Sequence, residues 1–178
     1  AYGFHGKAGA SLPYTPELFA LFEKTYGYDL AGRLVELAAD IGDFRRTRVD
    51  YWRLVSRLFA DNFSRQYARW CARRNLIYTG HFAGEETLQG SAAMNGDLFT
   101  AARHMHVPGL DILRTETPYD PPPPRARAGR ETDGERQSLG HIVAAKILVS
   151  TARAAGARRV LCEANGVSNW SVTLGDLK

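Results

Sequence analysis

The fold of this chain is decided by two segments of similar design, LIYTGHFAGEE at residues 76–86 and RVLCEANG at residues 159–166. Each begins with the apolar residues of a short buried β-strand, continues into a glycine-containing turn, and carries a glutamate near the strand end. Glu85 or Glu86 follows the first strand, and Glu163 ends the second. Because the carboxyl ends of parallel strands face the ligand site in α/β folds, we expect these carboxylates on one rim of a sheet.

Helical patterns fill the chain before these strands. Thr15-Pro16-Glu17 predicts a helix start, and Gly27 ends that helix. Asp29 caps a second short helix that Gly42 terminates. A long third helix begins near Asp43 and reaches Arg74, with an apolar stripe that needs a sheet to cover it. The stripe consists of Trp52, Val55, Leu58, Phe59, Phe63, Tyr67, Trp70 and Cys71.

Strands and helices then alternate. We expect a helix over 97–105, a strand over 110–113, a helix from Gln137 to Gly156 and a strand over 158–163. An irregular loop rich in Pro and Arg, about 115–136, separates the second strand from its helix, since four successive prolines fit neither a helix nor a central strand. This alternation predicts parallel βαβ units.

The predicted fold class is therefore α/β. A complete (β/α)8 TIM-type barrel needs roughly 250 residues, and the chain has 178. We expect residues 1–178 to form part of such a barrel, with parallel strands and long covering helices. The first residue is not Met and Asp176-Leu177-Lys178 reads as a helix start, so we expect a segment of a longer protein.

Composition limits the possible partners. The formal net charge is +4, from 23 Lys plus Arg against 19 Asp plus Glu, and the arginines are spread along the chain in short groups. Such groups are usually exposed helix faces, and no nucleic-acid motif accompanies them, so nucleic acid is not expected as a partner. No apolar run approaches the ~20 residues of a membrane span, so no membrane partner is expected. The two cysteines, Cys71 and Cys162, are expected to be buried core thiols.

The glutamates suggest a chemistry. Alternate strands of a sheet lie roughly 10 Å apart, so Glu163 and Glu85 or Glu86 are expected to face each other across ~6–10 Å. Cleavage of a glycosidic bond needs two carboxylates, one to protonate the leaving oxygen and one to activate water or attack the sugar. A structural role is the alternative, in which Glu163 caps the turn at Asn165-Gly166 and the other glutamates start a helix.

Several separated motifs add to this interpretation. YTGHFAGEE at 78–86 resembles a motif of bacterial barrel-type glycoside hydrolases related to the α-L-rhamnosidase family, as do four other segments in the same order. These are YGYDL at 26–30, DYW at 50–52, MHVPGLD at 105–111 and EANGVSNW at 163–170. The resemblance implies a large multidomain enzyme with this chain in its central barrel. The Pro/Arg loop has no counterpart in the family.

The resemblance also implies roles for individual residues. Glu85 and Glu163 become the candidate acid and base or nucleophile, with Glu86 as the alternate to Glu85; which one is the acid, and whether the enzyme inverts or retains, is left open. The candidate substrate-binding residues are His81, Asp111, Asn165 and Trp170. His81 would bind a sugar hydroxyl or, alternatively, backbone, and Trp170 would stack on a sugar ring or pack internally.

No cofactor and no metal are expected. Relatives of this type can bind calcium near the sugar, but no acidic cluster in the sequence has ligand spacing. His104 and His106, at a helix end, are expected to point apart. Two competing functions remain: a carbohydrate-binding barrel without catalysis, and nucleic-acid binding through the arginine groups, which salt dependence would reveal.

Overall fold

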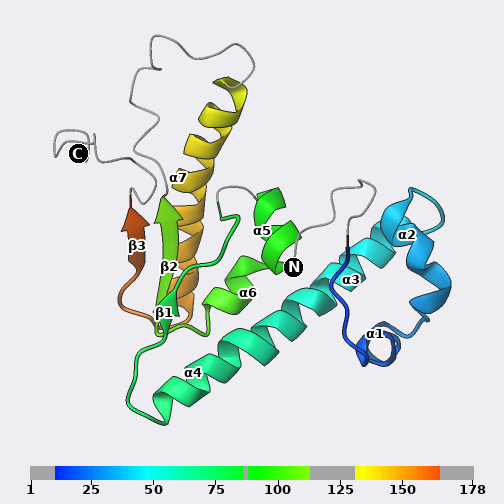
Figure 1. The fold of residues 1–178 in the computed structure, drawn as a ribbon, viewed down its shortest axis with the longest axis horizontal. Helices are drawn as coiled ribbons and strands as arrows, with labels where there is room; N and C mark the ends of the chain where they lie inside the picture. Colours follow the sequence, from blue (N-terminus) through cyan, green and yellow to red (C-terminus); the bar gives the residue numbers. More distant parts are fainter. Residues whose placement is uncertain (1–10, 86–87, 113–130, 165–178) are drawn as a thin grey trace.

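The computed structural model describes residues 11–85, 88–112 and 131–164. In this part of the chain, three parallel strands form one sheet in the order β1-β2-β3 (Figure 1). They are β1 (Thr79–Gly80), β2 (Val107–Ile112) and β3 (Leu161–Ala164). β2 lies between the two strands that precede or carry the glutamates, as the sequence predicted. The prediction that these strands form part of a (β/α)8 barrel stays a prediction.

The first strand is shorter than expected. Residues 76–78 precede β1, which begins at Thr79 and pairs with β2 through Thr79 opposite Val107 and Gly80 opposite Pro108. The two strands approach closely at Gly109, where a Cβ atom would lie 2.5 Å from the carbonyl oxygen of Gly80. A glycine is therefore required at this point of the sheet.

Helix α7 (Glu131–Ala154) connects β2 to β3 and packs against β2 behind the sheet (Figure 1). It begins at Glu131, so the prediction that the irregular loop extends to about 136 is wrong at its C-terminal end. The helical pattern there contains Gly134, which lowered the helix signal in the sequence. The proline run at 121–124 lies outside the described residues.

The predicted long helix is confirmed, with a local change of winding. It consists of α3 (Phe44–Phe59), a π-helical turn η2 (Ala60–Ser64) and α4 (Arg65–Ala72). Shorter helices precede and follow it: α1 (Leu18–Tyr26), the 3₁₀ turn η1 (Ala31–Arg33), α2 (Leu34–Ala38), α5 (Leu88–Asn95) and α6 (Leu98–Ala102). Both side-chain oxygens of Asp29 accept hydrogen bonds from the amides of Ala31 and Gly32, which confirms the predicted cap.

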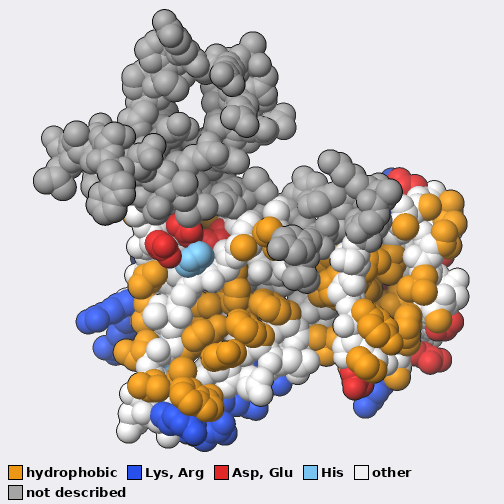
Figure 2. Space-filling model, viewed as in Figure 1, with side chains coloured by type: hydrophobic (Ala, Val, Ile, Leu, Met, Phe, Trp, Pro, Cys, Tyr) orange, Lys and Arg blue, Asp and Glu red, His pale blue; other side chains and the backbone are white. Residues whose placement is uncertain are grey.

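The predicted apolar stripe is wrong over its C-terminal part. Phe63, Tyr67 and Trp70 are 41%, 51% and 45% exposed, and Figure 2 shows hydrophobic side chains on the surface over α4. The small residues Ala60 and Ser64 face the core instead, where the Ser64 hydroxyl donates to the carbonyl of Ala101 at 2.7 Å. Small side chains let α6 approach the helix closely, which turns the large aromatic residues outward.

Two groups of buried residues form the interior. The sheet cluster joins the sheet, α6, α7 and the π turn, and contains Ala60, Phe82, Leu98, Ala101, Ala102, Met105, Leu110 and Leu148. The N-terminal cluster joins α1, α2 and α3, and contains Leu18, Phe22, Leu30, Leu37, Tyr51 and Leu54. The long helix contributes to both clusters and connects them (Figure 1).

The cysteines differ from one another. Cys71 is buried in α4, as predicted. The prediction of a buried Cys162 is wrong, because β3 lies at the edge of the described sheet and all four of its residues are exposed.

Candidate functional site

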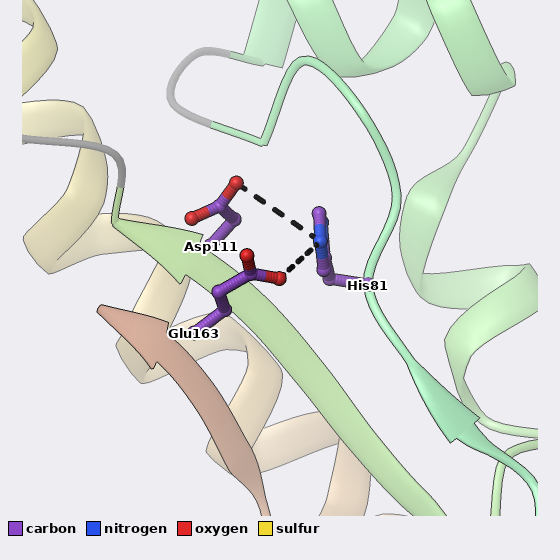
Figure 3. Close-up of side chains that lie close together, drawn as sticks. All are labelled: His81, Asp111 and Glu163. Carbon is purple, nitrogen blue, oxygen red and sulfur yellow. Dashed lines mark hydrogen bonds and ion pairs between the residues drawn. The ribbon is translucent and has the colours of Figure 1, made fainter. Parts of the chain in front are cut away.

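Three polar side chains meet at the carboxyl ends of the strands (Figure 3). His81 directly follows β1, Asp111 lies in β2 and Glu163 lies in β3 opposite Asp111 in the strand register. The Nε2 atom of His81 lies 3.1 Å from Oε2 of Glu163 and 4.0 Å from Oδ2 of Asp111. The parallel register therefore brings residues from three distant segments onto one side of the sheet.

Glu85 lies on the other side of the same imidazole ring. Its Oε1 is 3.4 Å from Nδ1 of His81 and accepts a hydrogen bond from the amide of Phe82 at 3.0 Å. Its Oε2 accepts a hydrogen bond from the amide of Asp111, also at 3.0 Å. Glu85 thus ties the loop after β1 to the end of β2.

Glu85 and Glu163 contact opposite nitrogens of one ring. Their nearest oxygens are therefore at most roughly 9 Å apart, a limit that admits both the inverting and the retaining arrangement of two carboxylates. Asp111 is the closer neighbour of Glu163, since the two residues are paired across β2 and β3. Glu163 therefore has two carboxylate neighbours among the described residues, Asp111 and Glu85. The sequence had predicted only Glu85 or Glu86 as its catalytic partner.

Exposure increases from Glu85 outward. The side chain of Glu85 is 3% exposed and that of Asp111 14%. The side chains of His81 and Glu163 are 30% and 55% exposed. Figure 2 shows acidic side chains and a histidine together on this face. Glu163 is consequently the carboxylate that an incoming molecule meets first.

The remaining predicted residues fall into two groups. Glu86, Asn165 and Trp170 lie outside the described residues. His106 has a structural contact, because its Nδ1 accepts a hydrogen bond from the amide of Tyr78 at 2.9 Å. Burial, and then the nearby charges of Arg103 and Arg65, lower the pKa of His104.

The carboxylates of the site also affect the pKa of the neighbouring Cys162 thiol. Although Cys162 is exposed as a residue, desolvation of its sulfur by neighbouring atoms raises its pKa, and the carboxylates of Asp111 and Glu85 raise the pKa further. A thiol with a raised pKa is a poor nucleophile, so Cys162 is not a candidate for covalent catalysis.

The cluster also has the composition of a metal site. One ligand atom from each of His81, Asp111 and Glu163 can be chosen so that all lie within 4.8 Å of one another. The expectation of no metal depended on the lack of ligand spacing in the sequence, a criterion that cannot detect donors from three separate segments. That expectation stays a prediction. The three donors come from different strands, so no local spacing in the sequence announces them; the sign that was available was a polar side chain at each strand end.

Comparison with models of protein families, with curated proteins and with solved structures found no match. None of the described helices is long and apolar enough to cross a membrane.

Proposed function

We propose that this chain carries the active site of a glycoside hydrolase of the α-L-rhamnosidase type, in a barrel to which the described strands contribute. The observation that supports the proposal is the meeting of Glu85, Asp111 and Glu163 around His81 at the carboxyl ends of parallel strands. Catalytic groups lie at this end in barrel enzymes.

Glu163 is the central catalytic candidate because it is the accessible carboxylate of the cluster. Glu85, across the imidazole ring, is its candidate partner, and Glu86 is the alternate. His81, Asp111 and Asn165 would bind hydroxyl groups of the sugar. Trp170, from the segment after β3, would stack on the sugar ring. A terminal sugar would approach from the side of Glu163.

Carbohydrate binding without hydrolysis is the second candidate, and the contacts of Glu85 favour it. Each oxygen of Glu85 already accepts a backbone hydrogen bond, and the side chain is 3% exposed. A carboxylate held in this way is poorly placed to deliver a proton to a leaving group. In this alternative the cluster binds sugar hydroxyls without cleaving the glycosidic bond.

The arginine groups give nucleic-acid binding little support. Arg46 and Arg48 pair with Asp50 and Asp40 at 3.7 and 2.8 Å. Charges neutralised within the chain contribute little to a phosphate-binding surface.

The test replaces Glu163 by Gln in the full-length protein and measures hydrolysis of a panel of aryl glycosides, aryl α-L-rhamnoside included. Removal of an acid or base costs roughly 10²–10⁴-fold in rate, and we expect a loss in that range. Glu23→Gln, at an exposed position on α1, is the matched control and should hydrolyse like the wild type.

Near-wild-type turnover by Glu163→Gln would remove Glu163 from the mechanism. Sugar binding by the wild type in calorimetry, with no turnover of any glycoside in the panel, would select the binding function.

A further inference from the structure

Calcium, which relatives of this type can bind near the sugar, does not fit the donor set at the strand ends. Calcium takes six to eight oxygen ligands in proteins. Here the donor at the centre of the cluster is an imidazole nitrogen, with one carboxylate oxygen each from Asp111 and Glu163 beside it. Imidazole nitrogen is a preferred ligand of zinc and similar transition metals instead.

We propose that His81, Asp111 and Glu163 bind a divalent transition-metal ion of the zinc type. Three protein ligands of this kind, His nitrogen and carboxylate oxygen, leave a fourth position for water or another small ligand. The ion would lie between Nε2 of His81 and the two carboxylates, where the three side chains point toward one another in Figure 3.

The distance between His81 and Glu163 suits such an ion. Ligands at 2.0–2.2 Å from a four-coordinate or six-coordinate metal are separated from one another by about 3.0–3.5 Å. Nε2 of His81 and Oε2 of Glu163 are 3.1 Å apart, within this range. Oδ2 of Asp111 is 4.0 Å from the same nitrogen, which is longer than this range, so metal binding would require the Asp111 carboxylate to move closer to the ring.

The surroundings of His81 give an independent reason. A histidine that binds a metal through one nitrogen usually donates its other N–H to a carboxylate, which fixes the orientation of the ring. Glu85 lies on that other side, with Oε1 3.4 Å from Nδ1, an ion-pair distance at which the described part of the structure shows no hydrogen bond to Nδ1. The backbone amides of Phe82 and Asp111 hold this buried carboxylate in place. Glu85 also orders Asp111, so one residue positions two of the three ligands.

A hydrogen bond between His81 and Glu163 is the simpler explanation of the shortest contact. It accounts for the 3.1 Å distance between Nε2 and Oε2, whereas the 4.0 Å separation between Nε2 and Oδ2 of Asp111 is too long for a hydrogen bond. A divalent ion would meet all three donors at once. The exposed side chain of Glu163 leaves an entry path from solvent.

The inference does not depend on hydrolysis, because the ion can be titrated in the absence of any glycoside. If both proposals hold, an ion bound to Glu163 occupies the accessible catalytic carboxylate, so added zinc should inhibit hydrolysis. Metal binding and turnover are measured separately, and failure of one is distinguishable from failure of the other.

The test is titration of the purified chain, freed of metal, with Co²⁺, whose visible absorption reports nitrogen and oxygen ligation. We expect one bound ion per chain, displaced by Zn²⁺ and not by a tenfold excess of Ca²⁺. His81→Ala and Asp111→Asn should each weaken Co²⁺ binding at least tenfold, with the far-ultraviolet circular dichroism unchanged. His104→Gln, which leaves the cluster intact, is the matched control and should bind like the wild type.

Glu85→Gln tests the positioning role, with an expected loss of affinity of roughly 10–100-fold. The absence of Co²⁺ bands up to millimolar concentration, equal binding by the folded His81→Ala and Asp111→Asn variants, or displacement by Ca²⁺ as readily as by Zn²⁺ would each overturn the proposal.

Discussion

At the scale of single residues, Glu85 is a buried carboxylate that connects two separate segments through hydrogen bonds. Its two oxygens accept amide hydrogen bonds from the loop after β1 and from β2. Replacement by Gln puts an NH₂ group against one of these amide donors, which leaves a buried hydrogen bond unmade. We expect Glu85→Gln to lower the free energy of unfolding by about 1–3 kcal/mol. Urea denaturation followed by circular dichroism measures this loss.

Glu163→Gln is the matched comparison for stability. Its side chain is 55% exposed, and changes at exposed positions usually stay within about 0.5 kcal/mol. Equal stability of the Glu85→Gln variant and the wild type would show that the two hydrogen bonds accepted by Glu85 do not contribute to the free energy of unfolding.

The structure brings together Glu163, His81 and Asp111, which the sequence had named as candidate site residues, because each lies at or near the end of a strand. It could not distinguish the environments of the carboxylates. Glu85 is buried because amides from two separate segments converge on it, and such long-range hydrogen bonds leave no periodic trace in the sequence. For the same reason the sequence did not predict that His81, Asp111 and Glu163 could together bind a metal ion, since these donors become neighbours only after the sheet has formed.

At the scale of elements, the close approach of β1 and β2 depends on Gly109. A Cβ atom there would lie 2.5 Å from the backbone oxygen of Gly80, which no side-chain rotation relieves. We expect Gly109→Ala to lower the free energy of unfolding by about 1–3 kcal/mol or more, as overpacking does. It should also weaken Co²⁺ binding, because His81 directly follows β1. Thermal unfolding and the Co²⁺ titration measure the two effects.

Gly32→Ala is the control for Gly109→Ala. A Cβ atom at residue 32 would lie 3.2 Å from a carboxylate oxygen of Asp29, whose side chain can move. The loss of stability should therefore be smaller than for Gly109→Ala. Equal effects of the two substitutions would show that the strand contact is not specially tight.

The long helix shows what periodicity can and cannot predict. The spacing of Trp52, Phe59 and the later aromatics correctly predicted a helix to about residue 72. It did not predict which face is buried, because the packing of Ala60 and Ser64 against α6 decides that face. Small residues carry little hydrophobic signal, although they allow the closest contact between helices.

At the scale of the whole molecule, alternation of strands and helices correctly predicted a parallel sheet. It did not predict that the N-terminal helices gather around a cluster of their own, since periodicity shows that a helix has an apolar face and not which elements cover it. Both clusters include residues of the long helix, yet they share no buried residue. The candidate site lies at the sheet, and the N-terminal cluster stands apart from it.

Because the sheet cluster and the N-terminal cluster share no buried residue, we expect the elements around each cluster to unfold locally and independently of the other. Phe22 is fully buried in the N-terminal cluster, and truncation of such a side chain costs about 3–5 kcal/mol. In Phe22→Ala we expect amides of α1 and α2 to exchange hydrogen faster, while amides of β2 keep most of their protection. Leu110→Ala, in the sheet cluster, should show the reverse pattern. Hydrogen exchange read by mass spectrometry distinguishes the two. If Phe22→Ala lowers protection in β2 as much as in α1, the long helix couples both clusters into one cooperative unit, and the candidate site depends on the N-terminal helices for its geometry.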